Sequence, residues 1–355
     1  MKSLQVLFVS RPNLHQQKGG DTLHLEQNRV YLQKQKVKIE LWDGSQDPDQ
    51  FDLIHFYGLS RPAEVLPLLK SKTPLVVSSI YVDYSEADRN TSKLRAFLQK
   101  GLGQHALDYL KLLARARKGG DHWPGWEYLM EGQKGSIRKI LDRCKHLITA
   151  SDAEYDLIRA EFPYQGKHSV VKLGTEHLPP MNRVSDKKDV LCVARIEPIK
   201  NQLSLIQAQE GSNWKLHLAG DAAPAHQAYL RKCKEAAGPK VLFHNHRNHE
   251  ECASMYNKAK VHVLPSLYES TGLASLEALH FGCQIVVNDS PISKELFEDQ
   301  AFYADVRNPE ALKDKINEAL QADINHSEWL HQNFSWQKAA LSIRKIYDDV
   351  LNLPS

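Results

Sequence analysis

Two glutamates mark the segment of this chain that is richest in potential chemistry. Glu269 lies in a loop after a predicted strand at 261–264, and Glu277 lies eight residues later, in a helix predicted for 272–281. Small or apolar residues form the start of that helix: Ser270, Thr271, Gly272 and Leu273. Its first backbone N–H groups therefore lack intrahelical partners and can bind a phosphate. Carboxylates accept hydrogen bonds from sugar and ribose hydroxyls, so the segment predicts a phosphate-and-sugar site.

A second charged pair, Arg195 and Lys200, follows a predicted strand at 190–194. A guanidinium binds phosphate oxygens through two donors and an ammonium acts as a point charge, so together they can neutralise a departing diphosphate. An arginine and a lysine at this spacing are usually ordinary surface charges. They become candidates here because they lie in the same half of the chain as Glu269 and Glu277.

Short apolar runs alternate with longer amphipathic stretches, which predicts an α/β protein with parallel sheets. In the first half, strands are predicted at 4–9, 37–42, 53–56, 75–79, 146–150 and 168–173. In the second half, strands are predicted at 190–194, 214–219, 241–243, 261–265 and 284–288. Apolar periodicity lapses at 179–189, so each half is expected to form its own doubly wound sheet.

Composition restricts the class of protein. The chain has 355 residues, 42% of them hydrophobic, and a formal net charge of +3, so no global charge points to a nucleic-acid partner. Its five cysteines are scattered, which argues against a disulfide framework or a thiolate zinc site. No apolar window approaches the ~18 residues of a membrane span, and the first residues lack signal-peptide features. We expect a cytoplasmic protein, at most on the inner face of a membrane.

The stretch 89–118 is unusually basic. It holds eight basic residues, with Asp108 as its one carboxylate: Arg89, Lys93, Arg95, Lys100, Lys111, Arg115, Arg117 and Lys118. Leucines interleave with them at near-helical spacing, a pattern typical of peripheral contact with an anionic lipid surface. A solvated helix face packed on the sheet, or a contact with a protein or nucleic acid, remains an alternative.

The segment 265–282 resembles the E-x7-E signature of retaining glycosyltransferases of family four. That family has the GT-B fold, in which two Rossmann-like, doubly wound domains face a central cleft. Ser270 and Thr271 replace the Gly and Phe that are usual there. The resemblance implies that Glu269 contacts the sugar hydroxyls of a nucleotide diphosphate sugar, Glu277 contacts the ribose, and the helix start at Gly272 holds the diphosphate.

The turn with Arg195 and Lys200 is similar to the family's G-R-x-x-x-x-K motif, which clamps the donor diphosphate, although Ala194 replaces the glycine. Gly19 and Gly20 resemble the family's first Gly-Gly loop, where glycine lets backbone approach phosphate and acceptor closely. An ordinary turn is the alternative for these two glycines.

Tyr81 departs from the family pattern, because it stands where a histidine is common after the strand at 75–79, while Asp83 remains nearby. The sugar that binds, or its orientation, can therefore differ from what is usual in the family. The alternative is that Tyr81 is a packed aromatic residue. His55 ends the strand at 53–56 and is a further sugar or acceptor candidate, although a structural role is more typical. All three are expected at the same edge of the first sheet.

Asn245 follows the strand at 241–243, in the loop that lines the base pocket in this family, so the resemblance implies contact with the nucleotide. It lies between His244 and His246, and two histidines at this spacing on a strand can bind a metal. A plain loop is the third alternative. The acidic turn at 47–49 imitates a metal-binding D-x-D, but its Pro and Gly neighbours favour a turn. We expect no metal site.

These features predict two domains, an acceptor-binding domain at 1–180 and a donor-binding domain at 181–335, with a last helix at 336–355 that packs back on the first. The predicted activity is retaining transfer of a hexose-type sugar to a hydroxyl of a glycan or lipid-linked acceptor, in cell-surface polysaccharide or glycolipid synthesis. The reaction is expected to need no metal or other cofactor. A nucleotide-sugar epimerase of the same fold and a non-catalytic nucleotide-sugar-binding subunit are the alternatives.

Overall fold

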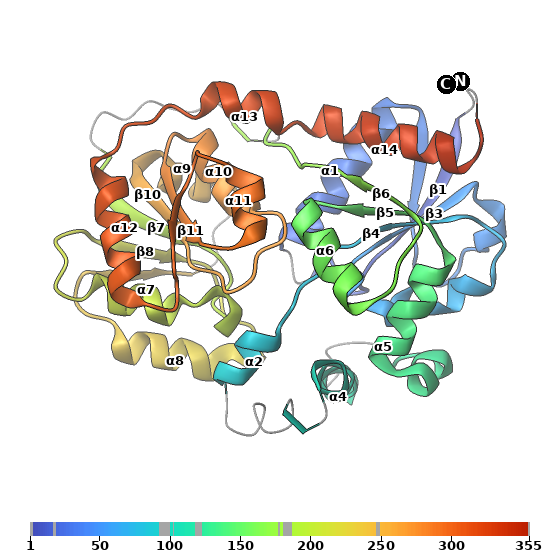
Figure 1. Cartoon of the computed structure of the whole chain (residues 1–355), viewed down its shortest axis with the longest axis horizontal. Coiled ribbons are helices and arrows are strands. Elements are labelled where there is room, and N and C mark those ends of the chain that lie inside the picture. The colour runs from blue at the N-terminus through green and yellow to red at the C-terminus, as the bar shows by residue number, and fades with distance from the viewer. Residues whose placement is uncertain are drawn as a thin grey trace. The chain divides into compact units, whose positions relative to one another are not determined.

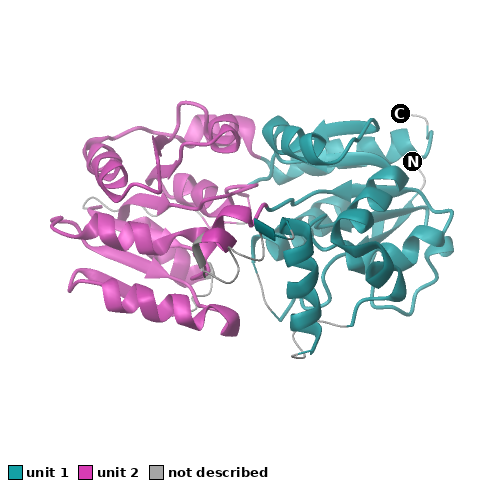
Figure 2. Ribbon diagram, turned by 60° about the horizontal axis from the view of Figure 1, so that its bottom comes forward, with its two compact units in different colours: residues 1–82, 93–174, 335–355 teal, residues 83–92, 175–334 magenta. Residues whose placement is uncertain are grey.

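The structure is a computed structural model, and it describes residues 3–16, 19–91, 100–101, 103–117, 123–176, 178–179, 187–245 and 249–353. The chain divides into two compact units (Figure 2). Unit 1 comprises residues 1–82, 93–174 and 335–355, and unit 2 comprises residues 83–92 and 175–334. The predicted boundary between residues 180 and 181 lies outside the described residues.

Unit 1 contains a six-stranded sheet in the order β2-β1-β3-β4-β5-β6, in which all neighbouring strands are parallel (Figure 1). Its strands are β1 (Leu4–Val9), β2 (Val37–Leu41), β3 (Leu53–Tyr57), β4 (Leu75–Ser78), β5 (Cys144–Thr149) and β6 (Lys167–Val170). Its helices are α1 (Gly20–Lys34), α4 (Gln104–Arg117), α5 (Trp126–Arg143), α6 (Asp152–Glu161) and α14 (Trp336–Val350), with short 3₁₀ turns η1 (Pro48–Gln50), η2 (Pro62–Glu64) and η3 (Leu66–Lys70).

Helices cover both faces of this sheet, because its inner strands carry apolar side chains on both sides. Every residue of β3 and β4 is buried. Leu7 and Val9 point into a core shared with α5, whereas Val6 and Phe8 point into a core shared with α1 and α14. The last helix, α14, thus completes a core that begins with the first strand.

Unit 2 contains a second parallel sheet in the order β12-β11-β10-β7-β8-β9. Its strands are β7 (Asp189–Val193), β8 (Leu216–Ala219), β9 (Val241–His244), β10 (Ala259–Leu264), β11 (Gln284–Asn288) and β12 (Phe302–Ala304). Its helices are α2 (Ser85–Thr91), α7 (Gln202–Gln209), α8 (Gln227–Ala236), α9 (His249–Lys258), α10 (Leu273–His280), α11 (Pro291–Phe297), α12 (Pro309–Gln321) and α13 (Ser327–Asn333), with 3₁₀ turns η4 (Pro198–Lys200) and η5 (Pro224–His226).

Each sheet has a topological switch point beside its first strand. In unit 2 the chain runs from β7 through β8 to β9 at one edge, then returns to place β10 on the other side of β7. In unit 1 the corresponding point lies between β1 and β3. Loops at the carboxyl ends of such strand pairs diverge, and open α/β sheets bind ligands there.

Each predicted strand is present, with ends that differ by at most three residues. The prediction missed β12, a three-residue edge strand. Within the described residues, no helix combines the length and the apolar character needed to cross a bilayer.

Candidate functional site

The loops after β7 and β10 bring Lys200 against Glu269. The N–H of Leu267 donates to the carbonyl of Ile199 at 2.8 Å, which ties the two loops together. Lys200 Nζ then lies 2.7 Å from Glu269 Oε2, and the two side chains are 18% and 20% exposed. Two residues predicted separately from the sequence therefore form one ion pair at the switch point of unit 2.

The charges of this pair support each other. Burial disfavours the charged form of Lys200, but the charge of Glu269 and its hydrogen bond, with a smaller effect of Glu197, give Lys200 a raised pKa. Ser266 Oγ lies 3.5 Å from the same Glu269 oxygen. The site thus holds a fixed cation and a partly exposed carboxylate, which can bind an anion and accept from hydroxyls.

Arg195 lies at the same edge but is more accessible, with 53% of its side chain exposed. Its Nη2 is 3.1 Å from Oε1 of the nearly buried Glu197, whose other oxygen lies 3.6 Å from His226 Nε2. Glu197 thus holds the guanidinium while about half of the Arg195 side chain stays exposed. The sequence analysis missed Glu197, although its place inside the Arg195–Lys200 turn was a usable signal.

Gly220 allows three loops to meet at this edge. Its φ is +143°, and a Cβ there would lie 2.1 Å from the Ala194 carbonyl oxygen. Its N–H donates to the carbonyl of His244 at 3.0 Å. Backbone contact after β7, β8 and β9 therefore requires glycine at this position. Asn245 follows β9 with an exposed side chain, so the structure places it at the carboxyl end of the edge strand.

The start of α10 also depends on glycine. Gly272 precedes the helix with φ +60°, and a Cβ there would lie 2.5 Å from Phe297 Cζ. Ser270 and Leu273 are buried, while Thr271 is half-buried. Ser270 and Leu273 would therefore meet a ligand through backbone N–H groups, not through their side chains.

Glu277 is held by a tyrosine that the sequence analysis did not single out. The buried Tyr256 hydroxyl lies 3.2 Å from Glu277 Oε2 and 3.1 Å from the Ala274 carbonyl oxygen, and its ring stacks on Phe281. Burial, with the charge of Glu277, holds the pKa of Tyr256 well above its usual value. Tyr256 therefore stays protonated and acts as a donor that orients the carboxylate.

In unit 1, Gly19 and Gly20 lie at the start of α1. Arg11 braces this loop: its Nε and Nη2 lie 2.5 and 3.1 Å from the two carboxylate oxygens of Asp21, and its Nη1 donates to Asn13 Oδ1 at 2.8 Å. Lys18, the residue before the glycines, lies outside the described residues. The nearly buried Arg11 was not predicted.

His55 belongs to the core of unit 1, not to a ligand site. Its ring is fully buried, with Nδ1 2.6 Å from the Tyr347 hydroxyl of α14 and Nε2 2.9 Å from Ser78 Oγ. Burial, reinforced by the nearby His24, holds the pKa of His55 well below its usual value. A neutral, fully enclosed imidazole does not contact a sugar, so the candidate role predicted for His55 is replaced by a structural one.

Tyr81 is packed as well. It is buried in the core of unit 1, its hydroxyl donates to Glu161 Oε2 at 2.6 Å, and its N–H donates to Glu154 Oε1 at 2.9 Å. Of the two alternatives for Tyr81, the structure favours the packed aromatic. Glu154, which also accepts from Ser79 Oγ at 2.6 Å, is a buried carboxylate that the sequence analysis missed.

Asp83 lies with unit 2, although it follows a strand of unit 1. It is exposed and accepts from the N–H of Ser85 at 2.8 Å, at the start of α2. Helix α2 packs against η4, the turn that ends at Lys200. Its Glu86 makes a two-point contact with Arg307, at 2.5 Å from both Nε and Nη2. Asp83 thus directly precedes the helix that packs against η4.

The histidines around Asn245 form no metal centre within the part of the chain that the structure describes. His244 Nε2 lies 2.9 Å from His217 Nδ1, whose Nε2 is 3.3 Å from Asp189. No three described His, Cys, Asp or Glu side chains are placed to hold an ion. His246 lies outside the described residues. The segment predicted as a turn forms η1 (Pro48–Gln50), and the Asp47 side chain before it accepts from the N–H of Asp49 at 3.1 Å.

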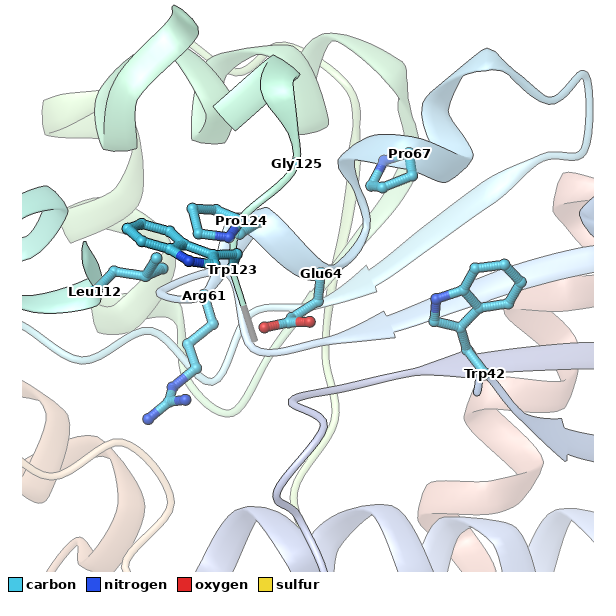
Figure 3. Close-up of a pocket in the computed structure, with 9 residues that line it drawn as sticks. Trp42, Arg61, Glu64, Pro67, Leu112, Trp123, Pro124 and Gly125 are labelled. Atoms are coloured by element: carbon cyan, nitrogen blue, oxygen red, sulfur yellow. The ribbon is translucent and has the colours of Figure 1, made fainter. Parts of the chain in front are cut away.

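Unit 1 also carries an open pocket of about 160 Å³. Its lining residues are Trp42, Arg61, Ala63, Glu64, Pro67, Leu112, Trp123, Pro124 and Gly125. Figure 3 shows the indoles of Trp42 and Trp123 on opposite sides of the Glu64 carboxylate. Aromatic faces beside charged groups suit a polar ring-shaped ligand. The sequence analysis did not anticipate this pocket, because its residues come from four separate segments.

Part of the chain is similar in sequence to known glycosyltransferases. Residues 175–337 match the family model of glycosyl transferases group 1, and these residues contain the pair Lys200–Glu269. The chain is 28% identical over 103 residues to the O-antigen biosynthesis glycosyltransferase WclY of Escherichia coli, covering 29% of each protein. It is 26% identical over 178 residues to the uncharacterized glycosyltransferase MJ1607 of Methanocaldococcus jannaschii, covering 46% of this chain and 45% of that protein. The chain thus matches less than half the length of these curated relatives.

Solved structures match over nearly the whole chain. Sucrose-phosphate synthase from Thermosynechococcus elongatus has a TM-score of 0.73 at 16% identity and covers 99% of this chain and 100% of its own. HepE from Anabaena, solved in complex with UDP-glucose, has a TM-score of 0.70 at 15% identity and covers 98% and 100%. Together with the two parallel six-stranded sheets, this similarity shows the GT-B fold.

Proposed function

We propose that this protein is a retaining glycosyltransferase that moves a hexose-type sugar from a nucleotide diphosphate sugar to a hydroxyl. The observation that carries the proposal is the contact between Lys200 and Glu269 at the switch point of unit 2. It places an anion-binding cation beside a carboxylate that accepts from hydroxyls, within the segment that matches glycosyl transferases group 1. A nucleotide diphosphate sugar has a group for each of these residues, since its diphosphate can bind the cation and its sugar hydroxyls can donate to the carboxylate.

In this proposal, each residue of unit 2 has a separate role. Arg195, Lys200 and the N–H groups that follow Gly272 neutralise the diphosphate as its charge grows, so the reaction requires no metal. Glu269 binds sugar hydroxyls and Glu277 binds the ribose. Glu269 also holds Lys200 charged before the donor arrives, which spares the site a reorganisation during the reaction.

Retention follows from attack on the same face of the sugar. The bond between the anomeric carbon and the diphosphate oxygen breaks, the acceptor oxygen forms the new bond, and the acceptor proton moves to the departing phosphate oxygen. This step rests on the resemblance described above. For this step the protein must hold the leaving group and exclude water.

For the acceptor, we infer a glycan or a lipid-linked sugar in the synthesis of cell-surface polysaccharide or glycolipid, at the cytoplasmic face of a membrane. The similarity to an O-antigen biosynthesis enzyme supports this class. The basic stretch 89–118 supports membrane contact. Its residues 92–99, 102 and 118 lie outside the described residues, and α4 carries Lys111, Arg115 and Arg117.

A thermal-shift screen of nucleoside diphosphates and their sugars tests the donor part. A ligand at about a hundred times its Kd stabilises the folded state by about 2.7 kcal/mol, so one nucleotide series should raise the Tm clearly. The double variant Arg195→Ala/Lys200→Ala should lose that shift. If no nucleotide raises the Tm of the wild-type protein, the proposal fails.

Product analysis with the donor so identified separates transfer from the alternatives. We expect a glycosylated product with a retained anomeric configuration when acceptor is present. Conversion of the donor to another nucleotide sugar without acceptor would identify an epimerase. Donor binding without turnover in any acceptor extract would identify a binding subunit.

A further inference from the structure

The three most exposed large apolar side chains of the described residues lie in unit 1, within the eight residues 123–130 at and just before the start of α5. Trp126 is 71% exposed, and Trp123 and Met130 are each 67% exposed, whereas the next value is 48%, for Leu341. Leu110 and Leu129 on the same helix pair are also exposed. We call this surface, made of Leu110, Trp123, Trp126, Leu129 and Met130, the α4–α5 face. Helices α4 and α5 lie together at one side of unit 1 (Figure 1).

The face is built by packing, so its apolar residues point outward for a structural reason. Trp126, Leu129 and Met130 follow an i, i+3, i+4 spacing, which places them on one side of the first turns of α5. The buried Tyr128 occupies the opposite side and stacks on Tyr109 of α4 at 5.4 Å. The Tyr109 hydroxyl also donates to the Leu129 carbonyl at 3.2 Å.

Gly132 separates this apolar segment from the rest of α5. Its φ of +66° and ψ of −176° are not helical, so the axis changes direction there. Beyond the glycine, the helix buries Ile137, Ile140 and Leu141 in the core of unit 1. Before the glycine, Tyr128 is also buried in that core, whereas Trp126, Leu129 and Met130 remain on the surface.

The charges around the face are predominantly positive. Each carboxylate on these first turns and on α4 pairs with a lysine: Asp108 with Lys111 at 3.0 Å, Glu127 with Lys70 at 2.5 Å, and Glu131 with Lys139 at 2.6 Å. Arg115 and Arg117 lie exposed at the end of α4. A surface that contacts the α4–α5 face therefore meets apolar side chains and more basic than acidic side chains.

We propose that the α4–α5 face docks on an anionic lipid bilayer, with Trp123, Trp126 and Met130 inserted at the headgroup level. Indole side chains suit that level because they are apolar with one polar N–H. Apolar insertion and attraction of arginine to anionic headgroups act together at such faces. This inference deepens the proposed function and rests on it for the lipid-linked acceptor. It extends the contact predicted for 89–118 to Trp123, Trp126, Leu129 and Met130, which the sequence analysis did not single out.

Vesicle cosedimentation of the full chain tests the proposal without donor or acceptor. We expect binding to phosphatidylcholine vesicles that contain about a third phosphatidylglycerol at about 0.1 M salt, and little binding to phosphatidylcholine alone. Trp126→Ala/Met130→Ala should weaken binding about tenfold or more, since each large apolar side chain contributes when buried. Arg115→Gln/Arg117→Gln should weaken it about thirtyfold, at about 1 kcal/mol for each arginine.

The matched control is Leu157→Ala/Leu341→Ala, which removes two apolar side chains of unit 1 that are 45% and 48% exposed elsewhere. It should bind vesicles like the wild type. The proposal is overturned if the wild-type chain stays in the supernatant with anionic vesicles, or if Trp126→Ala/Met130→Ala binds as the control does. Light scattering gives a further outcome that would overturn the proposal. If the wild-type chain is a dimer that does not bind vesicles, and Trp126→Ala/Met130→Ala makes it monomeric, the face binds a second copy of the chain.

Failure of this inference can be told from failure of the proposed function. The variants lie outside unit 2, so their Tm shift with the nucleotide donor should equal that of the wild type. Loss of vesicle binding with an intact donor shift concerns the face alone. An absent donor shift with intact vesicle binding would refute only the glycosyltransferase proposal.

Discussion

The two units use their switch points differently. In unit 2, Arg195, Lys200 and Glu269 lie at the carboxyl ends of the strands with part of each side chain open to a ligand. In unit 1, His55 in the middle of β3 and Tyr81 just after β4 are buried and hydrogen-bonded within the protein. Both sheets thus carry polar residues that were predicted as site candidates, and burial separates those in the core from those that a ligand can reach.

The difference follows from what covers each sheet edge. Tyr347 of α14 reaches the His55 ring, and Glu161 of α6 reaches the Tyr81 hydroxyl. In unit 2 the corresponding partner of Lys200 is Glu269, itself a predicted ligand residue. His55 and Tyr81 are thus covered by packed helices, whereas Lys200 and Glu269 lie on two loops that leave part of each side chain exposed.

Glu269→Ala tests the open site of unit 2 and should have the largest effect. We expect transfer to fall by about 100- to 1000-fold, the usual cost of losing a preorganised polar group. Nucleoside diphosphate affinity should change little, because the phosphate contacts come from Arg195, Lys200 and the helix start. Initial rates and titration of the free nucleotide measure the two quantities. An equal loss of both would contradict the separate roles.

The pH dependence of stability probes the buried histidines of unit 1. Burial lowers the pKa of His24 to about 4 and that of His55 well below 6.5. The unfolded chain binds these protons below about pH 6.5 while the folded chain does not, so stability is complete above that pH and falls as the pH drops towards 4. The loss is roughly 3 kcal/mol at most for His24.

Denaturant unfolding at several pH values between 7 and 4 measures this loss of stability. In His24→Leu, the free energy of unfolding should depend less on pH than in the wild type. His262 and His326 of unit 2, with pKa values lowered by burial to about 3 and about 4, contribute a loss of the same sign. If the free energy of unfolding of His24→Leu changes with pH as steeply as that of the wild type, His24 does not remain neutral in the folded unit.

Gly272→Ala distinguishes crowding from backbone strain at the start of α10. The new Cβ would collide with the Phe297 ring at a φ of +60°, so we expect a loss of about 2–3 kcal/mol in the free energy of unfolding. Gly211→Ala is the matched control, since Gly211 has φ +73° with no atom within 4 Å of the added Cβ. It should cost about 1 kcal/mol, the strain alone. Equal losses would mean that the Phe297 contact is unimportant.

Tyr81→Phe should have the smallest effect. It removes the hydrogen bond to Glu161, which keeps His105 Nε2 at 2.5 Å, so we expect a loss of about 1 kcal/mol or less. Transfer and donor affinity should stay within about twofold of the wild type, a change of under 0.5 kcal/mol. A tenfold drop in transfer with normal stability would give the hydroxyl a role with the sugar and contradict its assignment to the core.

Local sequence was sufficient for most of the elements. Apolar runs such as those of β3 and β10, and the glycine before α10, act within a few residues, so strands and helix starts could be predicted from neighbours alone. Glu269, Glu277, Arg195 and Lys200 could be named as candidates because their positions relative to strand ends are encoded locally. Phe302–Ala304 was missed because three residues carry too little periodicity to read as a strand.

Tertiary structure decided which of these groups meet and which are covered. Residues 69 positions apart form the Lys200–Glu269 contact, and helix α14 closes over His55 from 292 positions away. The spacing of residues in a sequence indicates on which side of its own helix or strand a side chain lies. Whether that side is buried depends on which distant element packs against it. For the same reason, the exposure of Trp126 and Met130 emerged from the fold: nothing in their spacing distinguishes an apolar helix side that faces a core from one that has none.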